Sequence, residues 1–368
     1  MNDFHHKMMR RALQLARKGI GKTSPNPAVG AVVVRDGAIA GEGWHRRAGT
    51  PHAEIHALRQ AGELARGSDV YVTLEPCSHY GKTPPCADAL VAAGVARVFI
   101  GMIDPNPLVS GRGVERLRRA GIGVESGLLE TECLRLNEAF IKHVTTGRPM
   151  VVLKSALTLD GKTATACGDS RWVTSPLSRR LVHRLRATMD GIMVGVGTLV
   201  ADDPELTVRL VKGRNPLRIV VDSELRMPLD ARLLTSAGGG GVVLATVCDD
   251  AVKLAAFAAT GADLLVCRQN DGRVDLVDML ERLGARGVQS ILLEGGETLA
   301  GEMLRQCLID KFLFFLAPKL VGGEGKGLFA GVGAALMNQA VPLRVERISR
   351  VGGDILLEAY PEAACLQD

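Results

Sequence analysis

Three short motifs constrain this chain more than any other feature of its sequence. They are His52-Ala53-Glu54, Pro76-Cys77 and Pro85-Cys86. One imidazole and two thiolates suit a tetrahedral zinc ion, and three protein ligands leave the fourth position open for water, as in catalytic sites. Zinc makes such a water acidic enough to react near neutral pH, and Glu54 can move its protons. The motifs therefore predict a catalytic zinc site with ligands His52, Cys77 and Cys86 and with Glu54 as catalytic acid and base.

The alternative is a surface histidine and two ordinary small buried cysteines. Either half of the pattern alone would leave that alternative open. Both halves in order, each cysteine preceded by a proline, favour the metal site. His79 lies between the two cysteines, but a fourth protein ligand would displace the catalytic water. We therefore expect three protein ligands.

The length of the chain predicts two domains. A chain of 368 residues is too long for one ordinary hydrophobic core. The alternating pattern pauses at Thr145–Pro149, so we expect the boundary between residues 1–147 and 148–368. In the first domain we expect helices at 4–19, 54–65, 87–93 and 114–120, and strands at 29–34, 39–43, 70–74 and 95–100. In the second we expect a helix at 176–187 and strands at 150–157, 191–197, 217–222, 241–246, 262–266, 290–293, 311–317 and 354–359. The last two strands should form an antiparallel addition. The fold class is α/β, with both halves of the metal site at helix starts.

The composition favours an enzyme that acts on small molecules. Aromatic residues make up 4% of the chain, which leaves few side chains for stacking on single-stranded nucleic acid. No uncharged apolar stretch reaches the ~18 residues that cross a bilayer. The start of the chain lacks a signal-peptide pattern, and the cysteines outside the zinc motifs are scattered without disulfide spacing. We expect a cytoplasmic protein that binds neither nucleic acid nor membrane.

The second domain carries weaker signals. The segment Leu293–Leu299 predicts a strand, a glycine pair and a helix, whose first amides could hold a phosphate. Alone, this pattern is more often a plain strand-to-helix turn. Lys154 stands beside Val151–Leu153, where burying a lysine is costly unless its charge is used. The three Gly-Lys-Thr triplets lack the upstream glycine of a phosphate-binding Walker loop.

The segment Thr73–Cys86 resembles the deaminase motif of the bifunctional deaminase/reductase family of riboflavin biosynthesis. The resemblance spans nearly the whole chain in the family's order, through residues 25–30, 104–107, 111–113, 159–162, 170–175 and 293–296. It implies an N-terminal cytidine-deaminase-like three-layer domain and a C-terminal dihydrofolate-reductase-like domain. It also implies zinc and NADPH as cofactors, and we expect a homo-oligomer. The implied substrate is 2,5-diamino-6-ribosylamino-4(3H)-pyrimidinone 5′-phosphate, which is deaminated before the ribosyl group of the aminouracil product is reduced to ribityl.

The resemblance also implies roles for single residues. In the deaminase half, the substrate contacts are Asn26, His45, Ala53 and Lys82. In the reductase half, the substrate side consists of Lys154, Ser170, Arg186, Leu206, Arg209 and Glu294. The NADPH side consists of Ala156, Trp172, Thr198, Asp202, Ser223, Gly296, Glu297 and Thr298.

Several of these roles have a physical basis or an alternative. Lys154 is the expected catalytic residue, which polarises the open-chain aldehyde or imine of the sugar. Arg186 suits a 5′-phosphate because its planar fork makes two charge-assisted bonds, although a solvated helix face is the alternative. Lys82 could also meet the substrate's phosphate. Asp202 could order the nicotinamide ribose or relay a proton.

Two other functions compete with this hypothesis. A nucleic-acid-editing deaminase would need more aromatic residues and a long basic stripe. A non-enzymatic zinc-stabilised binding module would need neither the open coordination position nor Glu54. Both fit the sequence less well than a two-step enzyme.

Overall fold

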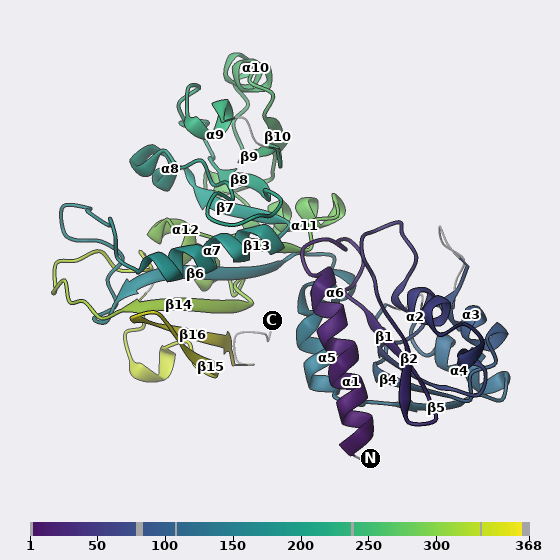
Figure 1. The fold of residues 1–368 in the computed structure, drawn as a ribbon. Coiled ribbons are helices and arrows are strands. Elements are labelled where there is room, and N and C mark those ends of the chain that lie inside the picture. Colours follow the sequence, from purple (N-terminus) through teal and green to yellow (C-terminus); the bar gives the residue numbers. More distant parts are fainter. Residues whose placement is uncertain (1–2, 79–83, 107–108, 237–238, 332, 363–368) are drawn as a thin grey trace. The chain divides into compact units, whose positions relative to one another are not determined.

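The chain divides into two compact units, Met1–Gly147 and Arg148–Asp368. The computed structural model describes residues 3–78, 84–106, 109–236, 239–331 and 333–362 (Figure 1). The division falls within Thr145–Pro149, where the sequence pattern pauses. Each unit has its own main sheet, with one buried apolar cluster in the first unit and two in the second among the described residues.

The first unit is built on a five-stranded sheet in the order β2-β1-β3-β4-β5. The strands are β1 (Gly30–Arg35), β2 (Ala38–Trp44), β3 (Asp69–Leu74), β4 (Arg97–Met102) and β5 (Gly123–Ser126). β1 runs antiparallel to β2 and β3, whereas β3, β4 and β5 are parallel. The helices are α1 (Asp3–Ala16), α2 (Ala53–Ala61), α3 (Cys86–Ala92), α4 (Arg112–Arg119), α5 (Glu130–Leu136) and α6 (Glu138–Thr146). α2, α3 and α4 neighbour one another on one side of the sheet, and α1 and α5 lie on the other side, so the unit has three layers (Figure 1).

Two glycines of β2 bring α2 close to the sheet. A Cβ atom on Gly43 would lie 2.1 Å from the carbonyl oxygen of Ala53, and one on Gly41 would lie 2.2 Å from that of Ala57. No other residue fits at these positions without moving the helix. The close packing fixes the start of α2, where His52 and Glu54 lie.

The second unit contains a nine-stranded sheet in the order β10-β9-β8-β7-β13-β6-β14-β16-β15. The strands from β10 to β14 in this order are parallel, and β16 and β15 complete the sheet in antiparallel fashion. Their bounds are β6 (Met150–Thr158), β7 (Gly191–Gly195), β8 (Leu217–Val221), β9 (Val242–Thr246), β10 (Asp263–Val266), β13 (Ser290–Leu293), β14 (Lys311–Ala317), β15 (Leu343–Val351) and β16 (Asp354–Pro361). A separate hairpin pairs β11 (Gln269–Asn270) with β12 (Arg273–Val274). The helices are α7 (Pro176–Thr188), α8 (Val196–Asp202), α9 (Arg232–Thr235), α10 (Ala251–Ala259), α11 (Leu276–Ala285) and α12 (Glu297–Arg305).

The structure confirms the α/β class and the expected strands, with a few differences. The strand expected over 191–197 ends at Gly195, because α8 begins at Val196. The helix expected over 54–65 leaves the α-helical form at Gly62, whose φ of 54° is left-handed, and ends in a 3-10 turn. β14 pairs in parallel with β6 as well as antiparallel with β16, so it belongs to the main sheet and not only to a terminal addition. The sequence pattern left several elements of both units unassigned: β5, α5, α6, α8, α9, α10, α11, β11, β12 and β15.

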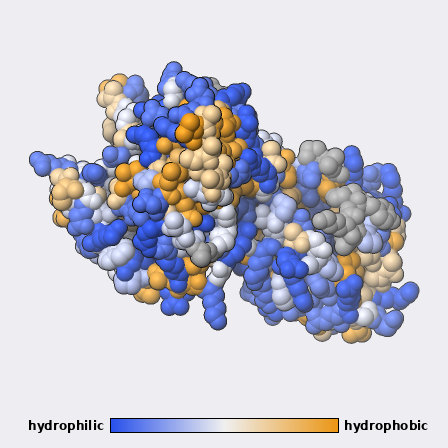
Figure 2. Space-filling view, turned by 90° about the horizontal axis from the view of Figure 1, so that it is seen from above, coloured by the Kyte–Doolittle hydropathy of each residue, from blue (hydrophilic) through white to orange (hydrophobic). Residues whose placement is uncertain are grey.

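No helix among the described residues is long and apolar enough to span a membrane. The face of the molecule in Figure 2 is mostly hydrophilic, with apolar side chains in separate patches. Scattered apolar residues of this kind are normal on protein surfaces.

Candidate active sites

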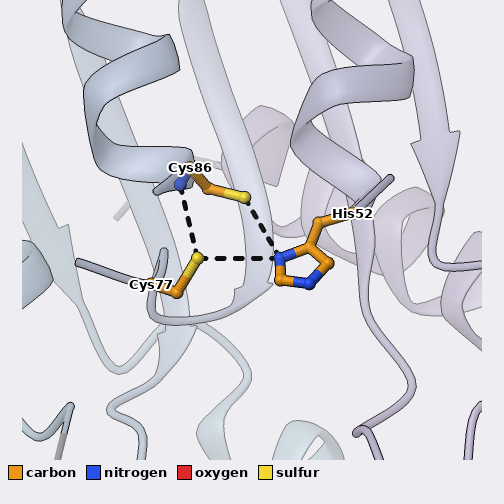
Figure 3. A group of neighbouring side chains, drawn as sticks. All are labelled: His52, Cys77 and Cys86. Atoms are coloured by element: carbon orange, nitrogen blue, oxygen red, sulfur yellow. Dashed lines mark hydrogen bonds between the residues drawn. The ribbon is translucent and has the colours of Figure 1, made fainter. Parts of the chain in front are cut away.

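His52, Cys77 and Cys86 point toward one another in the first unit (Figure 3). The distance from His52 Nδ1 to Cys77 Sγ is 3.6 Å, and the distance to Cys86 Sγ is 3.3 Å. All three possible ligand atoms lie within 4.8 Å of one another. Cys77 and Cys86, which follow His52 by 25 and 34 positions in the sequence, thus form one cluster with it.

The fold explains why these side chains meet. His52 is the N-cap residue of α2, and Cys86 is the first residue of α3. Cys77 lies in the segment after β3, where the backbone N–H of Ala87 donates to its carbonyl oxygen at 3.1 Å. The positive ends of the two helix dipoles favour thiolate at this point.

The cluster fits a tetrahedral zinc ion. Zinc lies about 2.3 Å from sulfur and about 2.0 Å from nitrogen, so tetrahedral ligands separate N and S by about 3.6 Å. The two N–S distances agree with this separation. Hydrogen bonds from Cys86, together with His52, lower the pKa of the Cys77 thiol to about 4. The cluster therefore favours the thiolate form of Cys77, which is the form that binds a metal ion.

Glu54 is buried beside this cluster with one oxygen unpaired. Its side chain is 3% exposed, and Oε2 has no hydrogen-bond partner. Burial, followed by the nearby Cys77, raises the pKa of Glu54 to about 7. A buried polar atom without a partner is costly unless the site normally supplies one, such as a reacting water. Glu54 therefore has the environment of a group that exchanges protons near neutral pH.

Asn26, His45 and Ala53 lie around the same cluster. Asn26 Nδ2 and His45 Nε2 are 3.2 Å apart, and the His45 ring meets the His52 ring edge-on with 5.2 Å between centroids. Burial lowers the pKa of His45, so this ring is neutral near pH 7. Ala53 is fully buried at the start of α2. Lys82 lies outside the described residues.

In the second unit, Glu294 joins Lys154 and Arg186 in a buried ion-pair cluster. Arg186 donates to both carboxylate oxygens, from Nε at 2.7 Å and from Nη2 at 3.0 Å. Lys154 Nζ lies 3.4 Å from Glu294 Oε2. The side chain of Arg186 is only 13% exposed, which excludes the solvated helix face for this residue. Burial alone would raise the pKa of Glu294, but the charges of Arg186 and Lys154 hold it at about 2.

A loop after α8 lies against this cluster. Arg186 Nη1 donates to the carbonyl oxygen of Thr207 at 3.1 Å, and the backbone N–H of Arg209 donates to His183 Nδ1 at 3.1 Å. Leu206 between them is buried with a φ of 54°. The side chain of Arg209 is half exposed and pairs with Glu205 at 2.8 Å. Leu206 and Arg209 are thus held close to Arg186 through backbone contacts.

Four of the expected NADPH residues lie near the carboxyl ends of neighbouring strands of the sheet. The neighbouring strands β8, β7, β13 and β6 are parallel, so their carboxyl ends share an edge, where α/β proteins place ligands. Ser223 follows β8, Thr198 follows β7 in α8, Gly296 follows β13, and Ala156 lies near the end of β6. A Cβ atom on Gly296 would lie 3.1 Å from Thr198 Oγ1, and φ is 87° there, so the glycine has a steric reason.

Glu297 and Thr298 occupy the first turn of α12, and their side chains are exposed. Asp202 is the last residue of α8 and is also exposed. Trp172 is 61% exposed, with the Arg179 guanidinium 4.3 Å from its ring centroid. Ser170 precedes it in the segment between β6 and α7. Their positions leave these side chains accessible to a ligand.

The sequence analysis missed three buried polar residues. Asn137 pairs with both backbone groups of Ala28, accepting from its N–H at 2.8 Å and donating to its carbonyl at 3.0 Å. This contact fixes the loop that carries Asn26. His183 orders the segment before Arg209, and Glu75 follows β3 in the metal-site segment. Glu75 offered a signal, because a charged residue directly after a buried strand is unusual, whereas Asn137 offered none.

Two protein-family sequence models match separate parts of the chain. Residues 2–102 match the family described as cytidine and deoxycytidylate deaminase zinc-binding region. Residues 149–357 match the RibD C-terminal domain. The two matches divide the chain in the same order as its two compact units.

Full-length relatives combine the same two parts. The chain is 46% identical to the riboflavin biosynthesis protein RibD of Actinobacillus pleuropneumoniae, covering 95% of this chain and 93% of that protein. It is 45% identical to RibD of Escherichia coli, covering 95% and 97%. The crystal structure of a diaminohydroxyphosphoribosylaminopyrimidine deaminase/5-amino-6-(5-phosphoribosylamino)uracil reductase from Thermotoga maritima superposes with a TM-score of 0.87 at 38% identity, covering 98% and 99%. Acinetobacter baumannii RibD, form 1, gives a TM-score of 0.88 at 38% identity over the same shares. The chain therefore belongs to the RibD family of bifunctional deaminase/reductases of riboflavin biosynthesis.

Proposed function

We propose that this protein catalyses two successive reactions on a phosphorylated pyrimidine. The first is hydrolytic deamination of 2,5-diamino-6-ribosylamino-4(3H)-pyrimidinone 5′-phosphate. The second is NADPH-dependent reduction of the ribosyl group of the resulting 5-amino-6-(5-phosphoribosylamino)uracil to ribityl. The observation that carries the proposal is the His52–Cys77–Cys86 cluster with the unpaired carboxyl oxygen of Glu54 beside it.

His52, Cys77 and Cys86 would hold the zinc ion of the deaminase unit. Zinc supplies acidity to a bound water and leaves a fourth position open for it. Glu54 takes a proton from the attacking water and returns protons to the ring nitrogen and to the departing ammonia. The water oxygen forms a bond to the ring carbon, and the bond between that carbon and the amino nitrogen then breaks.

Asn26 and His45 would bind the pyrimidine edge. The amide of Asn26 both donates and accepts, and neutral His45 does the same through its two nitrogens. The contact between them, at 3.2 Å, orients both groups before the substrate arrives. Ala53 leaves room for the ring close to Glu54, and Lys82 would meet the phosphate.

In the reductase unit, bound NADPH would supply the hydride that reduces C1′ of the open-chain sugar. Lys154 donates a hydrogen bond to the imine or aldehyde of this carbon and stabilises the charge that develops there. Three of the five N–H groups of Arg186 bind Glu294 and Thr207, which leaves two for the substrate's phosphate. Leu206, Arg209 and Ser170 complete the substrate side. The nucleotide would lie along the edge formed by Ala156, Trp172, Thr198, Asp202, Ser223 and Gly296–Thr298.

Incubation of the purified protein with the diaminopyrimidine phosphate tests the proposal. We expect ammonia without NADPH, and NADPH oxidation once the cofactor is added. His52→Ala should abolish ammonia release but still oxidise NADPH with the deaminated intermediate. Arg10→Ala, an exposed residue of α1, is a matched control that should keep both activities. Ammonia release by His52→Ala at the wild-type rate would remove the metal-site assignment.

The assembly and the location of the protein belong to the same proposal. β15 is an edge strand of the nine-stranded sheet, and its Val345 and Ile348 are 49% and 65% exposed. An edge strand presents unpaired backbone groups, and with these two exposed apolar side chains beside them it can pair with a second copy, so we propose a homo-oligomer. Light scattering of the purified chain would measure its mass. The scattered cysteines favour the cytoplasm, and cell fractionation would test this location.

A further inference from the structure

Glu75 is a buried charged residue to which neither reaction assigns a role. It is 3% exposed and comes directly after the last residue of β3, two positions before Cys77. Burying a carboxylate is costly unless hydrogen bonds replace its lost water. The groups that replace that water show what Glu75 holds in place.

Four backbone N–H groups donate to this single carboxylate. Gly113 and Val114 donate to Oε1 at 2.9 and 3.2 Å. Asp104 and Gly111 donate to Oε2 at 3.2 and 3.0 Å. Gly113 and Val114 lie in the first turn of α4, where N–H groups lack helical partners and the dipole favours a negative charge. Glu75 therefore fastens the end of β3 to the start of α4.

Gly113 shows how tight this junction is. A Cβ atom at this position would lie 2.0 Å from the carbonyl oxygen of Pro76 and 3.1 Å from Glu75 Oε1. The start of α4 thus touches the backbone of the residue that immediately precedes Cys77. No side chain fits there unless the junction opens.

Cys77 is also held from the other side by α3. The N–H of Cys86 donates to Cys77 Sγ at 3.3 Å, and the N–H of Ala87 donates to its carbonyl oxygen at 3.1 Å. The Cys77 backbone is therefore clamped between the starts of two helices. Glu75 makes the contacts that hold this segment against the start of α4.

We infer that Glu75 is a positioning residue for the metal ligand Cys77. By fastening the Pro76–Cys77 turn to α4, it keeps Sγ 3.6 Å from His52 Nδ1. The inference rests on the proposed metal site and adds a residue that contacts neither metal nor substrate. Removing groups that orient a ligand typically weakens metal binding 10–100-fold.

Glu75→Gln tests this role with little change in volume. The amide has one acceptor oxygen, and its NH2 group would face two N–H donors, so two of the four hydrogen bonds are lost. The metal affinity of the full chain would be measured by chelator competition, with Zn²⁺ and with Co²⁺. We expect 10–100-fold weaker binding and a shifted thiolate-to-cobalt absorption band, with unchanged NADPH oxidation on the deaminated intermediate.

Leu13→Ala is the matched control for a purely structural effect. Leu13 is buried in α1, on the other side of the sheet from α2, α3 and α4, so its loss lowers stability without touching the junction. We expect Leu13→Ala to melt at a lower temperature but to keep wild-type metal affinity and the wild-type cobalt spectrum. Wild-type affinity and spectrum in Glu75→Gln would overturn the inference, even if that variant melts early.

Two further measurements keep the test decisive. If Glu75→Gln fails to fold, Gly113→Ala replaces it. Gly123→Ala in β5 is its control, because a Cβ atom there would lie 3.2 Å from the Arg97 side chain and 3.7 Å from the Ala96 carbonyl oxygen. We expect weakened metal binding in Gly113→Ala only, and equal affinity of these two variants would overturn the inference. If the wild type and His52→Ala bind Co²⁺ equally well, the proposed metal site itself is wrong.

Discussion

Glu54 and Glu294 are both buried glutamates at the start of a helix or the end of a strand, but their surroundings give them opposite properties. Glu54 has an unpaired oxygen, and burial raises its pKa to about 7. Glu294 accepts from Arg186 and Lys154, whose charges outweigh burial and hold its pKa at about 2. Because burial raises the pKa of both carboxyl groups, the comparison shows that at similar burial the neighbouring charges decide whether such a group can exchange protons near pH 7.

The difference corresponds to two ways of building an active site. The first unit leaves one acceptor unpaired, so the site is completed by water and substrate. The second unit neutralises its carboxylate, so Glu294 orients the two cations that face the substrate. A mutation of Glu54 should therefore affect chemistry more than stability, and a mutation of Glu294 should affect both.

Glu54→Gln should have the largest effect on activity. Losing a general acid and base typically costs 10²–10⁴-fold in rate, so we expect ammonia release to fall by about 10³-fold. The metal content should persist, because Glu54 is not a ligand, and thermal stability should not fall, because a neutral amide replaces an unpaired carboxyl group. Ammonia assays, elemental analysis and calorimetry measure these quantities. Retained turnover would contradict both the role of Glu54 and the comparison.

Glu294→Gln should destabilise the second unit. The change leaves Arg186 and Lys154 close together without a counter-charge, and breaking a buried ion pair typically costs about 3 kcal/mol. We expect a lower denaturation midpoint for the second unit and slower NADPH oxidation, with ammonia release unchanged. Glu281→Gln is the matched control, because that side chain is exposed in α11 and belongs to neither proposed site. Equal denaturation midpoints for the two variants would mean that the ion pairs of Glu294 do not stabilise the second unit.

The sequence predicted the two units unequally, for physical reasons. The metal cluster was predictable because His52, Cys77 and Cys86 have few roles in common other than metal binding. The buried ion pairs of Glu294 were not predictable as contacts, because Lys154 and Arg186 come from a different strand and helix. The apolar run around Lys154 indicated that its charge is used but not which residue it pairs with. Asn137 was equally hidden, since a single asparagine gives no sign that it pairs with the backbone of Ala28.

Local patterns predicted strands better than helix ends. Parallel strands such as β8 and β13 are short apolar runs with buried residues, so periodicity and composition agree. α5 and α6 were missed because they are short, and α6 begins after Asn137, whose φ of −115° interrupts the helix. β15 contains three arginines and consists only of exposed and half-buried residues, which fits an edge strand but also a loop.

Arg186→Lys sharpens the comparison without removing charge. Lysine cannot make the two parallel bonds to Glu294, nor keep two further N–H groups for a phosphate. We expect about a 10-fold rise in the KM of the reductase substrate, with a small change in kcat and little change in NADPH binding. Arg184→Lys, on an exposed position of the same helix, is the control. A fall in kcat alone would place Arg186 at the reacting carbon instead of the phosphate.

The smallest expected effect concerns the pH dependence of stability in the second unit. Burial, with the charges of Arg186 and Arg209, lowers the pKa of His183 to about 4. An unfolded histidine titrates near 6.5, so between about pH 6.5 and 4 the unfolded chain binds a proton that the folded chain does not. Stability should therefore fall as the pH falls through this window, by about 1 kcal/mol after allowance for partial hydration.

Glu294 should not contribute to this loss above about pH 5.5, because an unfolded glutamate titrates near 4.3 and the folded carboxylate stays ionised there. His183→Gln should flatten the pH dependence between about pH 6.5 and 5.5, where Glu294 does not yet contribute, measured by urea unfolding at several pH values. The same scan of His6→Gln, at a half-buried position of α1, should keep the wild-type slope in the second unit. A wild-type slope in His183→Gln would mean that another titrating group causes the loss of stability at low pH. The cations around Glu294 would then not extend their influence to the loop that His183 holds.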